Sequence, residues 1–204
     1  SVLHGTLLVI LLILLFLFAA AGIVGTRANR AFPALVMATT GFSCLVWELL
    51  CVFVYQTVFG AIYGDIAVLT GCYMAGICAG SLAVYRPRYI KNPTRFLGTV
   101  ESLFALFFMA SAGIFFFPWS PPQPLFFLLA AFCGLLAGVE FPLATARMRA
   151  SGQRGKIGTL YAFDLAGACI GSVLAGAFLV PAAGLLIPLL CIAAIKAMTG
   201  IALR

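Results

Sequence analysis

A proline-rich connection, PWSPPQP (residues 118–124), separates two long apolar stretches, FLGTVESLFALFFMASAGIFFF (96–117) and LFFLLAAFCGLLAGVEFPLATA (125–146). A helix needs about twenty mainly apolar residues to cross a hydrocarbon core of roughly 30 Å, and each stretch is long enough. The prolines cannot sustain a helix, so we expect an outer loop with Trp119 at the membrane interface. This part of the chain therefore predicts two neighbouring transmembrane helices.

The same pattern continues in both directions and predicts an all-α, polytopic integral membrane helix bundle. Hydrophobic residues make up 64% of the chain and charged residues 8%, which excludes an ordinary soluble domain. The connections are too short to fold separately, so residues 1–204 are interpreted as a single transmembrane domain. Its seven predicted helices cover residues 3–25, 34–59, 66–85, 96–117, 125–146, 157–179 and 185–203, with breaks marked by Pro33, Pro87, Pro93, Pro181 and the 118–124 cluster.

The first apolar run, residues 5–26, also has some character of a signal sequence. It is long for the apolar region of such a sequence, and no basic segment precedes it. We interpret it as a retained helix.

The basic residues predict the orientation of the bundle. All twelve can be placed on one side of the membrane: Arg27, Arg30, Arg86, Arg88, Lys91, Arg95, Arg147, Arg149, Arg154, Lys156, Lys196 and Arg204. The alternate connections, near residues 60–65, 118–124 and 180–184, hold no Lys or Arg. Because cytoplasmic loops are enriched in these residues, we expect the N-terminus outside and the C-terminus in the cytoplasm. Basic loops beside apolar spans favour anionic lipid over nucleic acid as the partner. We expect the membrane to be a bacterial-type cytoplasmic (inner) membrane.

Cysteine and histidine give no support for a cofactor or metal site. The seven cysteines lie in predicted spans without a CxxC pair, and we interpret them as small apolar side chains: Cys44, Cys51, Cys72, Cys78, Cys133, Cys169 and Cys191. The single histidine, His4, excludes paired-imidazole haem ligation within the chain. We therefore expect no cofactor, and no catalytic set such as Ser/His/Asp or a Walker loop occurs.

Four of the five carboxylates fall within predicted helices, where an ionised group at the centre costs about 2.5–3.5 kcal/mol without a partner, a proton or water. The fifth, Asp65, is expected to be solvated at an outer turn. Glu101 and Asp164 lie near helix N-termini, whose dipole favours a carboxylate. Glu140 lies near a C-terminus and most needs a cation, for which Arg147 is two turns away on the same face. Pro142 cannot donate to the carbonyl of Gly138, which leaves a further polar group beside Glu140.

Glu48 is the deepest acid, with Trp47, Tyr55 and Gln56 nearby in sequence. One interpretation is a polar cavity or proton-coupled path lined by Glu48, Glu140 and Asp164. The other is that the acids clamp helices together through Arg, Lys, Tyr and Ser partners. The candidate intramembrane polar site consists of Glu48, Tyr55, Gln56, Glu101, Glu140, Tyr161 and Asp164.

Small residues four apart predict close helix packing in lipid. They form three pairs: Gly76 and Gly80, Gly134 and Gly138, and Gly167 and Gly171. The Phe-rich faces, Phe104, Phe107, Phe108 and Phe115–Phe117, are expected to face lipid. The alternative is that they pack against another subunit or a lipid-soluble cofactor.

Several stretches resemble the multi-pass membrane region of spermidine synthase-like proteins, the polyamine aminopropyltransferase family in which a transmembrane bundle precedes the catalytic domain. They are TGFSCLVWELL (40–50), YQTVFGAIYG (55–64), YMAGICAGSLA (73–83), GVEFPLA (138–144) and GTLYAFDLAGACIGSVLAGAFLVPAAG (158–184). The resemblance implies that Glu48 matches a family acid in the second helix. It also implies that Gly138, Phe141 and Pro142 match a Gly-x-x-Phe-Pro turn, and that Tyr161, Gly167 and Gly171 match a sixth-helix pattern. Glu140 and Asp164 are positions where relatives are expected to vary.

In family members with synthase activity, a soluble Rossmann-like domain holds decarboxylated S-adenosylmethionine and the polyamine. This sequence contains no strand–glycine-loop–helix unit of that kind. The first hypothesis is therefore a non-catalytic membrane module that anchors or serves a partner domain or subunit; if it is part of an enzyme, that enzyme is an aminopropyltransferase. The alternatives are a structural subunit of a larger membrane complex, including an electron-transfer complex, and a carrier-like bundle for a small cationic solute such as a polyamine.

Overall fold

The computed structural model describes residues 32–60, 63–84, 92–116, 121–150, 152 and 157–203. Its elements are all helical: α2 (Phe32–Phe59), α3 (Tyr63–Ala83), α4 (Pro93–Phe116), α5 (Gln123–Ala150), α6 (Ile157–Val173), a π-helical turn η3 (Leu174–Leu179), α7 (Val180–Ala183) and α8 (Leu186–Ala202). The helix predicted over residues 3–25 lies outside the described residues. The described helices begin and end within a few residues of the predicted ranges.

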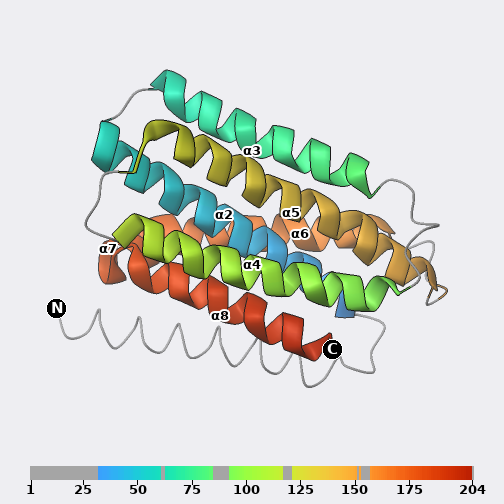
Figure 1. The fold of residues 1–204 in the computed structure, drawn as a ribbon. Helices are drawn as coiled ribbons and strands as arrows, with labels where there is room; N and C mark the ends of the chain where they lie inside the picture. Colours follow the sequence, from blue (N-terminus) through green and yellow to red (C-terminus); the bar gives the residue numbers. More distant parts are fainter. Residues whose placement is uncertain are drawn as a thin grey trace.

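Within the described residues, five helices are long and apolar enough to cross a membrane, with α6, η3 and α7 forming one continuous span, Ile157–Ala183. The last helix, α8, has 17 residues. Figure 1 shows the chain running back and forth, so that successive connections lie at opposite ends of the bundle. The described part of the chain is thus a multi-pass helix bundle with the composition of an integral membrane protein.

The helix following Ile157 ends later than the sequence predicts. A break at Pro181 was expected, but the helix passes through η3 and continues to Ala183. Within this turn the Val180 N–H donates to the carbonyl of Ala175, five residues back. Pro181 is tolerated because it stands in the first turn of α7, where a missing N–H is least costly. Gly184, with a φ of 72°, then turns the chain into α8.

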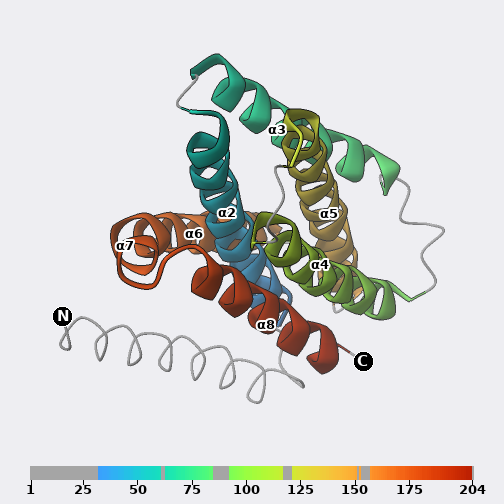
Figure 2. The same ribbon diagram turned by 60° about the vertical axis from the view of Figure 1, so that its left-hand side comes forward.

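Three helix pairs make up the bundle. α3 packs on α5, α2 on α6 and α4 on α8, while α2 and α5 also contact the other pairs. Figure 2 shows α2 near the middle, with α6 to its left, α5 and α4 to its right, and α8 passing in front. Most residues of α2 are buried, so this helix contributes a large part of the core.

The α3–α5 pair is held by glycines of each helix that lie against backbone carbonyls of the other. A Cβ atom at Gly76 or Gly80 of α3 would collide with the carbonyl of Ala131 or Leu135 of α5, and one at Gly134 or Gly138 of α5 with carbonyls of Tyr73 or Ile77 of α3. The contact is therefore reciprocal, with each backbone lying in the groove that the other's glycines leave open.

The α2–α6 pair crosses in the same way. Gly41 of α2 lies against the carbonyl of Asp164, and Gly167 and Gly171 of α6 lie against the backbone of Ala38 and Phe42. Gly41 was not among the predicted packing glycines because no second glycine lies four residues away. Its role depends on α6, which a local pattern in α2 does not reveal.

The core between α2, α4 and α5 is aromatic. Trp47, Phe104 and Phe108 are fully buried and Phe107 almost so, with the ring centroids of Trp47 and Phe107 5.1 Å apart. The expectation that Phe104, Phe107 and Phe108 face lipid was therefore wrong. Phe116, by contrast, is exposed at the surface of the bundle. The three buried rings fill the interior of the bundle beside the polar groups described below.

Candidate functional site

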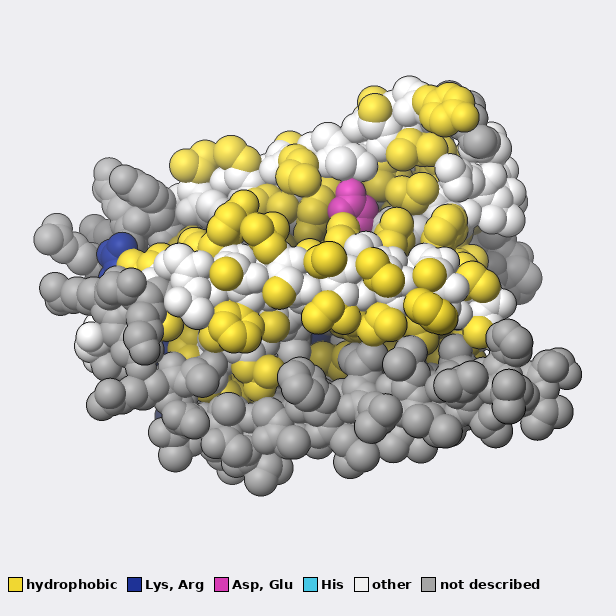
Figure 3. Space-filling view, turned by 180° about the vertical axis from the view of Figure 1, so that it is seen from behind, with side chains coloured by type: hydrophobic (Ala, Val, Ile, Leu, Met, Phe, Trp, Pro, Cys, Tyr) yellow, Lys and Arg dark blue, Asp and Glu magenta, His cyan; other side chains and the backbone are white. Residues whose placement is uncertain are grey.

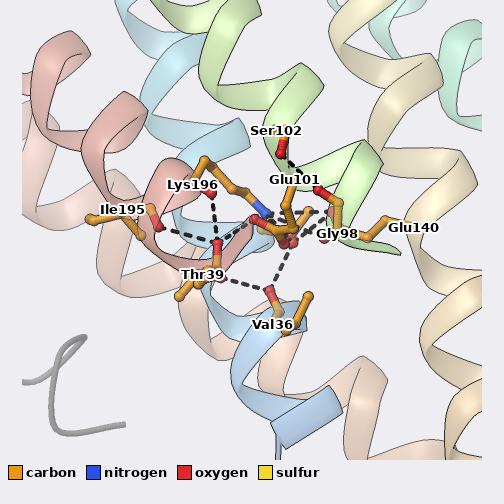
Figure 4. Close-up of polar contacts among 10 residues, drawn as sticks. Val36, Thr39, Gly98, Glu101, Ser102, Glu140, Ile195 and Lys196 are labelled. Atoms are coloured by element: carbon orange, nitrogen blue, oxygen red, sulfur yellow. Dashed lines mark hydrogen bonds and ion pairs between the residues drawn. The ribbon is translucent and has the colours of Figure 1, made fainter. Parts of the chain in front are cut away.

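Four helices place polar side chains at one point in the interior. Lys196 comes from α8, Glu101 from α4, Glu140 from α5 and Thr40 from α2. The side chains of Lys196, Glu101 and Glu140 have no exposed surface, and Thr40 is 2% exposed. Together with Thr199 of α8, we call these residues the core cluster; Figure 4 shows their contacts.

Lys196 is bound tightly to one acid and more loosely to the other. Its Nζ lies 2.9 Å from Oε1 of Glu101, and 3.4 and 3.5 Å from the two carboxylate oxygens of Glu140. It also donates to Oγ1 of Thr40 at 2.6 Å and lies 4.7 Å from the centre of the Phe104 ring. A buried ammonium is costly unless it is paired and hydrogen-bonded, and all three of its protons have acceptors here.

Two threonine hydroxyls complete the core cluster. Thr199 donates to Oε2 of Glu101, so both oxygens of that carboxylate have a donor. Oγ1 of Thr40 lies 2.8 Å from Oε2 of Glu140 and 2.8 Å from the carbonyl of Val36. The core cluster thus joins α2, α4, α5 and α8 through one continuous hydrogen-bond network.

Two expectations about the cations were wrong. Lys196 was assigned to the cytoplasmic flank, but it is fully buried and provides the cation that Glu140 needs. Arg147, the predicted partner of Glu140, lies with its guanidinium 4.9 Å from the Phe32 ring, and its Nη1 has no hydrogen-bond partner. Along α5, Arg147 is displaced by about two turns toward the helix end, whereas Lys196 approaches Glu140 from a different helix.

Pro142 leaves a free carbonyl at Gly138, as the sequence predicts, and α3 supplies its donor. The Ser81 hydroxyl of α3 donates to this carbonyl at 3.0 Å. The contact lies where the two glycine-lined backbones meet. Ser81 was missed because its partner is 57 residues away in sequence.

Glu48 is not part of the core cluster. It lies on α2 with 8% of its surface exposed, and the hydroxyl of Thr70 on α3 is its hydrogen-bonding neighbour. Figure 3 shows a carboxylate on one face of the bundle surrounded by hydrophobic side chains. The polar cavity predicted between Glu48, Glu140 and Asp164 is thus not a single group of contacting side chains among the described residues.

The other predicted site residues are also separate from the core cluster. Asp164 is partly buried on α6 beside Gly41 of α2, and it lies close enough to Lys196 to interact with its charge. Tyr161 is exposed at the surface of α6. Gln56 is partly buried on α2, and its backbone carbonyl accepts the Gly60 N–H at 2.9 Å.

A second polar group, here called the end cluster, consists of Tyr55, Asp65 and Gln123 at the opposite end of the bundle. The Tyr55 hydroxyl donates to Oδ2 of Asp65 at 2.7 Å, while Nε2 of Gln123 lies 2.7 Å from that hydroxyl and 3.0 Å from Oδ2. The expectation that Asp65 is simply solvated was wrong, because it accepts hydrogen bonds from α2 and α5. Gln123 was missed because it stands in the proline-rich connection, which the sequence marks only as a loop.

These arrangements limit the chemistry. All seven cysteines are free, and the described residues contain no group of three or more His, Cys, Asp or Glu side chains placed to hold a metal ion. The core cluster can bind an ammonium group and can hold a proton between carboxyl groups. Neither property by itself makes or breaks a covalent bond.

Comparison with models of known protein families, with curated proteins and with solved structures gives no match to this chain. The resemblance to spermidine synthase-like proteins therefore stays a prediction.

Proposed function

We propose that the chain is the non-catalytic membrane module of a spermidine synthase-like protein, which anchors or serves a partner domain or subunit. One observation carries the proposal: the stretches that bear the resemblance are those that form the helix crossings. Residues 73–83 and 138–144 contribute Gly76, Gly80 and Gly138 to the α3–α5 contact, and residues 40–50 and 158–184 contribute Gly41 and Gly167 to the α2–α6 contact. These motifs are accounted for by packing.

The core cluster supports the same interpretation. Glu101 and Glu140, which a catalytic or transport role would require to meet a substrate, are both bound to Lys196 of the same chain. A site of this kind fixes the relative positions of four helices. A rigid bundle is what a membrane anchor or scaffold requires.

The proposed arrangement in the membrane has seven spans, with the N-terminus outside and the C-terminus cytoplasmic in a bacterial-type inner membrane. Arg95, Arg147 and Arg149 lie near the ends of α4 and α5 that share one end of the bundle in Figure 1. The basic connections would then contact anionic lipid headgroups on the cytoplasmic face. Cysteine labelling from either side of intact spheroplasts tests this orientation.

The test of function is purification from the native membrane in a mild detergent, followed by native and intact-mass spectrometry. The proposal expects a synthase-like domain, on the same or another polypeptide, in fixed stoichiometry. Aminopropyltransferase activity of that material, assayed with decarboxylated S-adenosylmethionine and a diamine, identifies the partner. Co-purification with haem or quinone proteins instead would favour the structural subunit of an electron-transfer complex and overturn the proposal.

A carrier for a small cationic solute is the second candidate, favoured by one specific observation. The core cluster holds a primary ammonium between two carboxyl groups and a hydroxyl. The terminal amine of a polyamine presents the same chemical group. Uptake of radiolabelled polyamine into proteoliposomes, lost in Glu140→Gln and in Glu48→Gln, would support the carrier; absence of uptake in the wild type would remove it.

A further inference from the structure

The charges of the core cluster do not balance if every group is ionised. Glu101 and Glu140 would contribute two negative charges and Lys196 one positive charge, and none of the three side chains has exposed surface. Among the described residues, the remaining basic side chains are Arg95, Arg147 and Arg149, and none of them forms an ion pair with the cluster. An uncompensated charge in this interior is costly, so a proton is required.

The hydrogen-bond geometry indicates which acid holds that proton. Glu101 behaves as the carboxylate, because its Oε1 lies 2.9 Å from Nζ of Lys196. Glu140 is farther from Lys196, with its two oxygens 3.4 and 3.5 Å from Nζ. The acid farther from the ammonium gains less from ionising in the interior, so it is the one that keeps its proton.

The contacts of Thr40 fit the same assignment. Its Oγ1 has three polar neighbours: Nζ of Lys196, the carbonyl of Val36 and Oε2 of Glu140. The hydroxyl has one hydrogen, and the Val36 carbonyl can only accept. If Thr40 donates to Val36, the contact with Glu140 requires a hydrogen from Glu140.

We infer that the core cluster is a proton-binding site in which Glu140 is a neutral carboxylic acid and Lys196 and Glu101 form the ion pair. Glu140 donates to Thr40, Thr40 donates to the Val36 carbonyl, and Lys196 donates to Glu101 and Thr40. The three ionisable groups then carry no net charge, which satisfies the interior. This inference goes beyond the proposed anchoring role and does not depend on it.

The site lies nearer to one end of α5 than to the other. Glu140 is ten residues from the end of α5, which corresponds to about 15 Å along the helix. The charged groups that face it are Lys196 of α8 and Glu101 of α4, while Asp164 of α6 lies farther away and feels Lys196. Arg147 stands between Glu140 and the end of α5.

Infrared spectroscopy of the full-length, lipid-reconstituted protein at neutral pH tests the inference. The chain has three glutamates, Glu48, Glu101 and Glu140, so carboxyl-¹³C glutamate labelling reports on these alone. The expected result is a C=O stretching band of a protonated carboxylic acid that shifts with the label. The wild type minus Glu140→Gln difference spectrum should contain it. A labelled wild type without such a band would overturn the inference with no mutant required.

Two variants keep the assignment decisive if Glu140→Gln does not fold. Glu48→Gln should retain the band, because Glu48 lies outside the core cluster; loss of the band would place the proton on Glu48 and overturn the inference. Combined with Glu48→Gln, which removes any band from Glu48, Glu101→Gln should lose it, because Glu140 must then ionise to balance Lys196. Retention of the band in that double variant would contradict the charge balance.

Discussion

The α3–α5 pair and the α4–α8 pair show two different solutions to helix association. α3 and α5 meet through four glycines and backbone carbonyls, and within this crossing the Ser81 hydroxyl donates to the Gly138 carbonyl. α4 and α8 meet through the ion pair of Glu101 and Lys196, the Thr199 hydroxyl and the Phe104 ring. Lipid tails are as apolar as leucine, so helices in a bilayer gain little from apolar contact alone. Close backbone packing and buried polar contacts are the two remaining ways to stabilise helix association. The α3–α5 pair relies mainly on the first, and the α4–α8 pair mainly on the second.

The difference has a consequence for tolerance to mutation. A larger residue at a glycine crossing meets the backbone carbonyls of the other helix, so the two helices must move apart and lose van der Waals contact. The core cluster loses charge balance at once, because removing one member leaves another unpaired in the interior. We therefore expect the largest effects from the α4–α8 pair and smaller ones from the glycine and hydroxyl contacts.

Lys196→Met should be the most damaging single substitution. It leaves Glu101 and Glu140 without a cation, and breaking a buried pair in this way costs about 3–5 kcal/mol. Unfolding in a detergent titration, followed by circular dichroism and by the fluorescence of buried Trp47, measures the loss.

The matched control for that variant removes the acids as well. Lys196→Met combined with Glu101→Gln and Glu140→Gln contains no ionisable group in the core cluster and should recover most of the lost free energy. A single Lys196→Met variant as stable as the wild type would show that the α4–α8 pair does not depend on the ion pair.

Gly76→Leu tests the glycine crossing with the next largest effect. The new side chain would collide with the Ala131 carbonyl, and inserting extra atoms at a packed contact costs about 1–3 kcal/mol. Gly71→Leu, also in α3, is the control, because nothing lies within 4 Å of a Cβ at that position. The same unfolding titration should separate the two variants, and equal stabilities would argue against close backbone packing of α3 on α5.

Hydropathy predicted the helices well because bilayer thickness sets their length, and that constraint is local in sequence. The glycine pairs of α3, α5 and α6 are local patterns too, so they could be found without knowing their partners. The pairing of helices could not be read in the same way, since helices with apolar residues on most faces give no clear indication of which face meets which neighbour.

The core cluster shows this limit most clearly. Glu101 and Glu140 were candidates because an acid within a span is costly, but the cation is 56 residues from Glu140 on α8. Lys196 is near the end of an apolar run, where long cationic side chains usually extend to the interface. Thr40 gave no signal at all, because a threonine in a membrane helix ordinarily bonds its own backbone. Only the packing of α2 beside α5 and α8 makes it a cluster residue.

Ser81→Ala should have a moderate effect and tests the hydrogen bond that lies within the glycine crossing of α3 and α5. The Gly138 carbonyl, beside Pro142, would lose its hydrogen-bond donor. An unsatisfied buried acceptor costs about 1–3 kcal/mol. Hydrogen bonds between membrane helices contribute less, about 0.6 kcal/mol on average. We expect a loss of about 1 kcal/mol in the unfolding titration. Ser172→Ala on the exposed face of α6, where the hydroxyl bonds only its own helix, should be close to neutral. Equal losses in the two variants would mean that the Ser81 contact adds nothing to the crossing.

Tyr55→Phe should have the smallest effect, although it removes a hydroxyl that links three helices. The variant keeps the ring, which packs edge-on against Phe126 with centroids 5.5 Å apart. Asp65 is only partly buried and retains Gln123 as a donor at 3.0 Å, so the cost should be about 0.5–1.5 kcal/mol. Gln123→Leu in the Tyr55→Phe background should add a further loss, since Asp65 then has neither donor, and a double-mutant cycle in the same titration measures the coupling. A cost as large as that of Lys196→Met would contradict the comparison, because it would give a partly exposed, hydrogen-bonded cluster the same weight as a sealed ion pair.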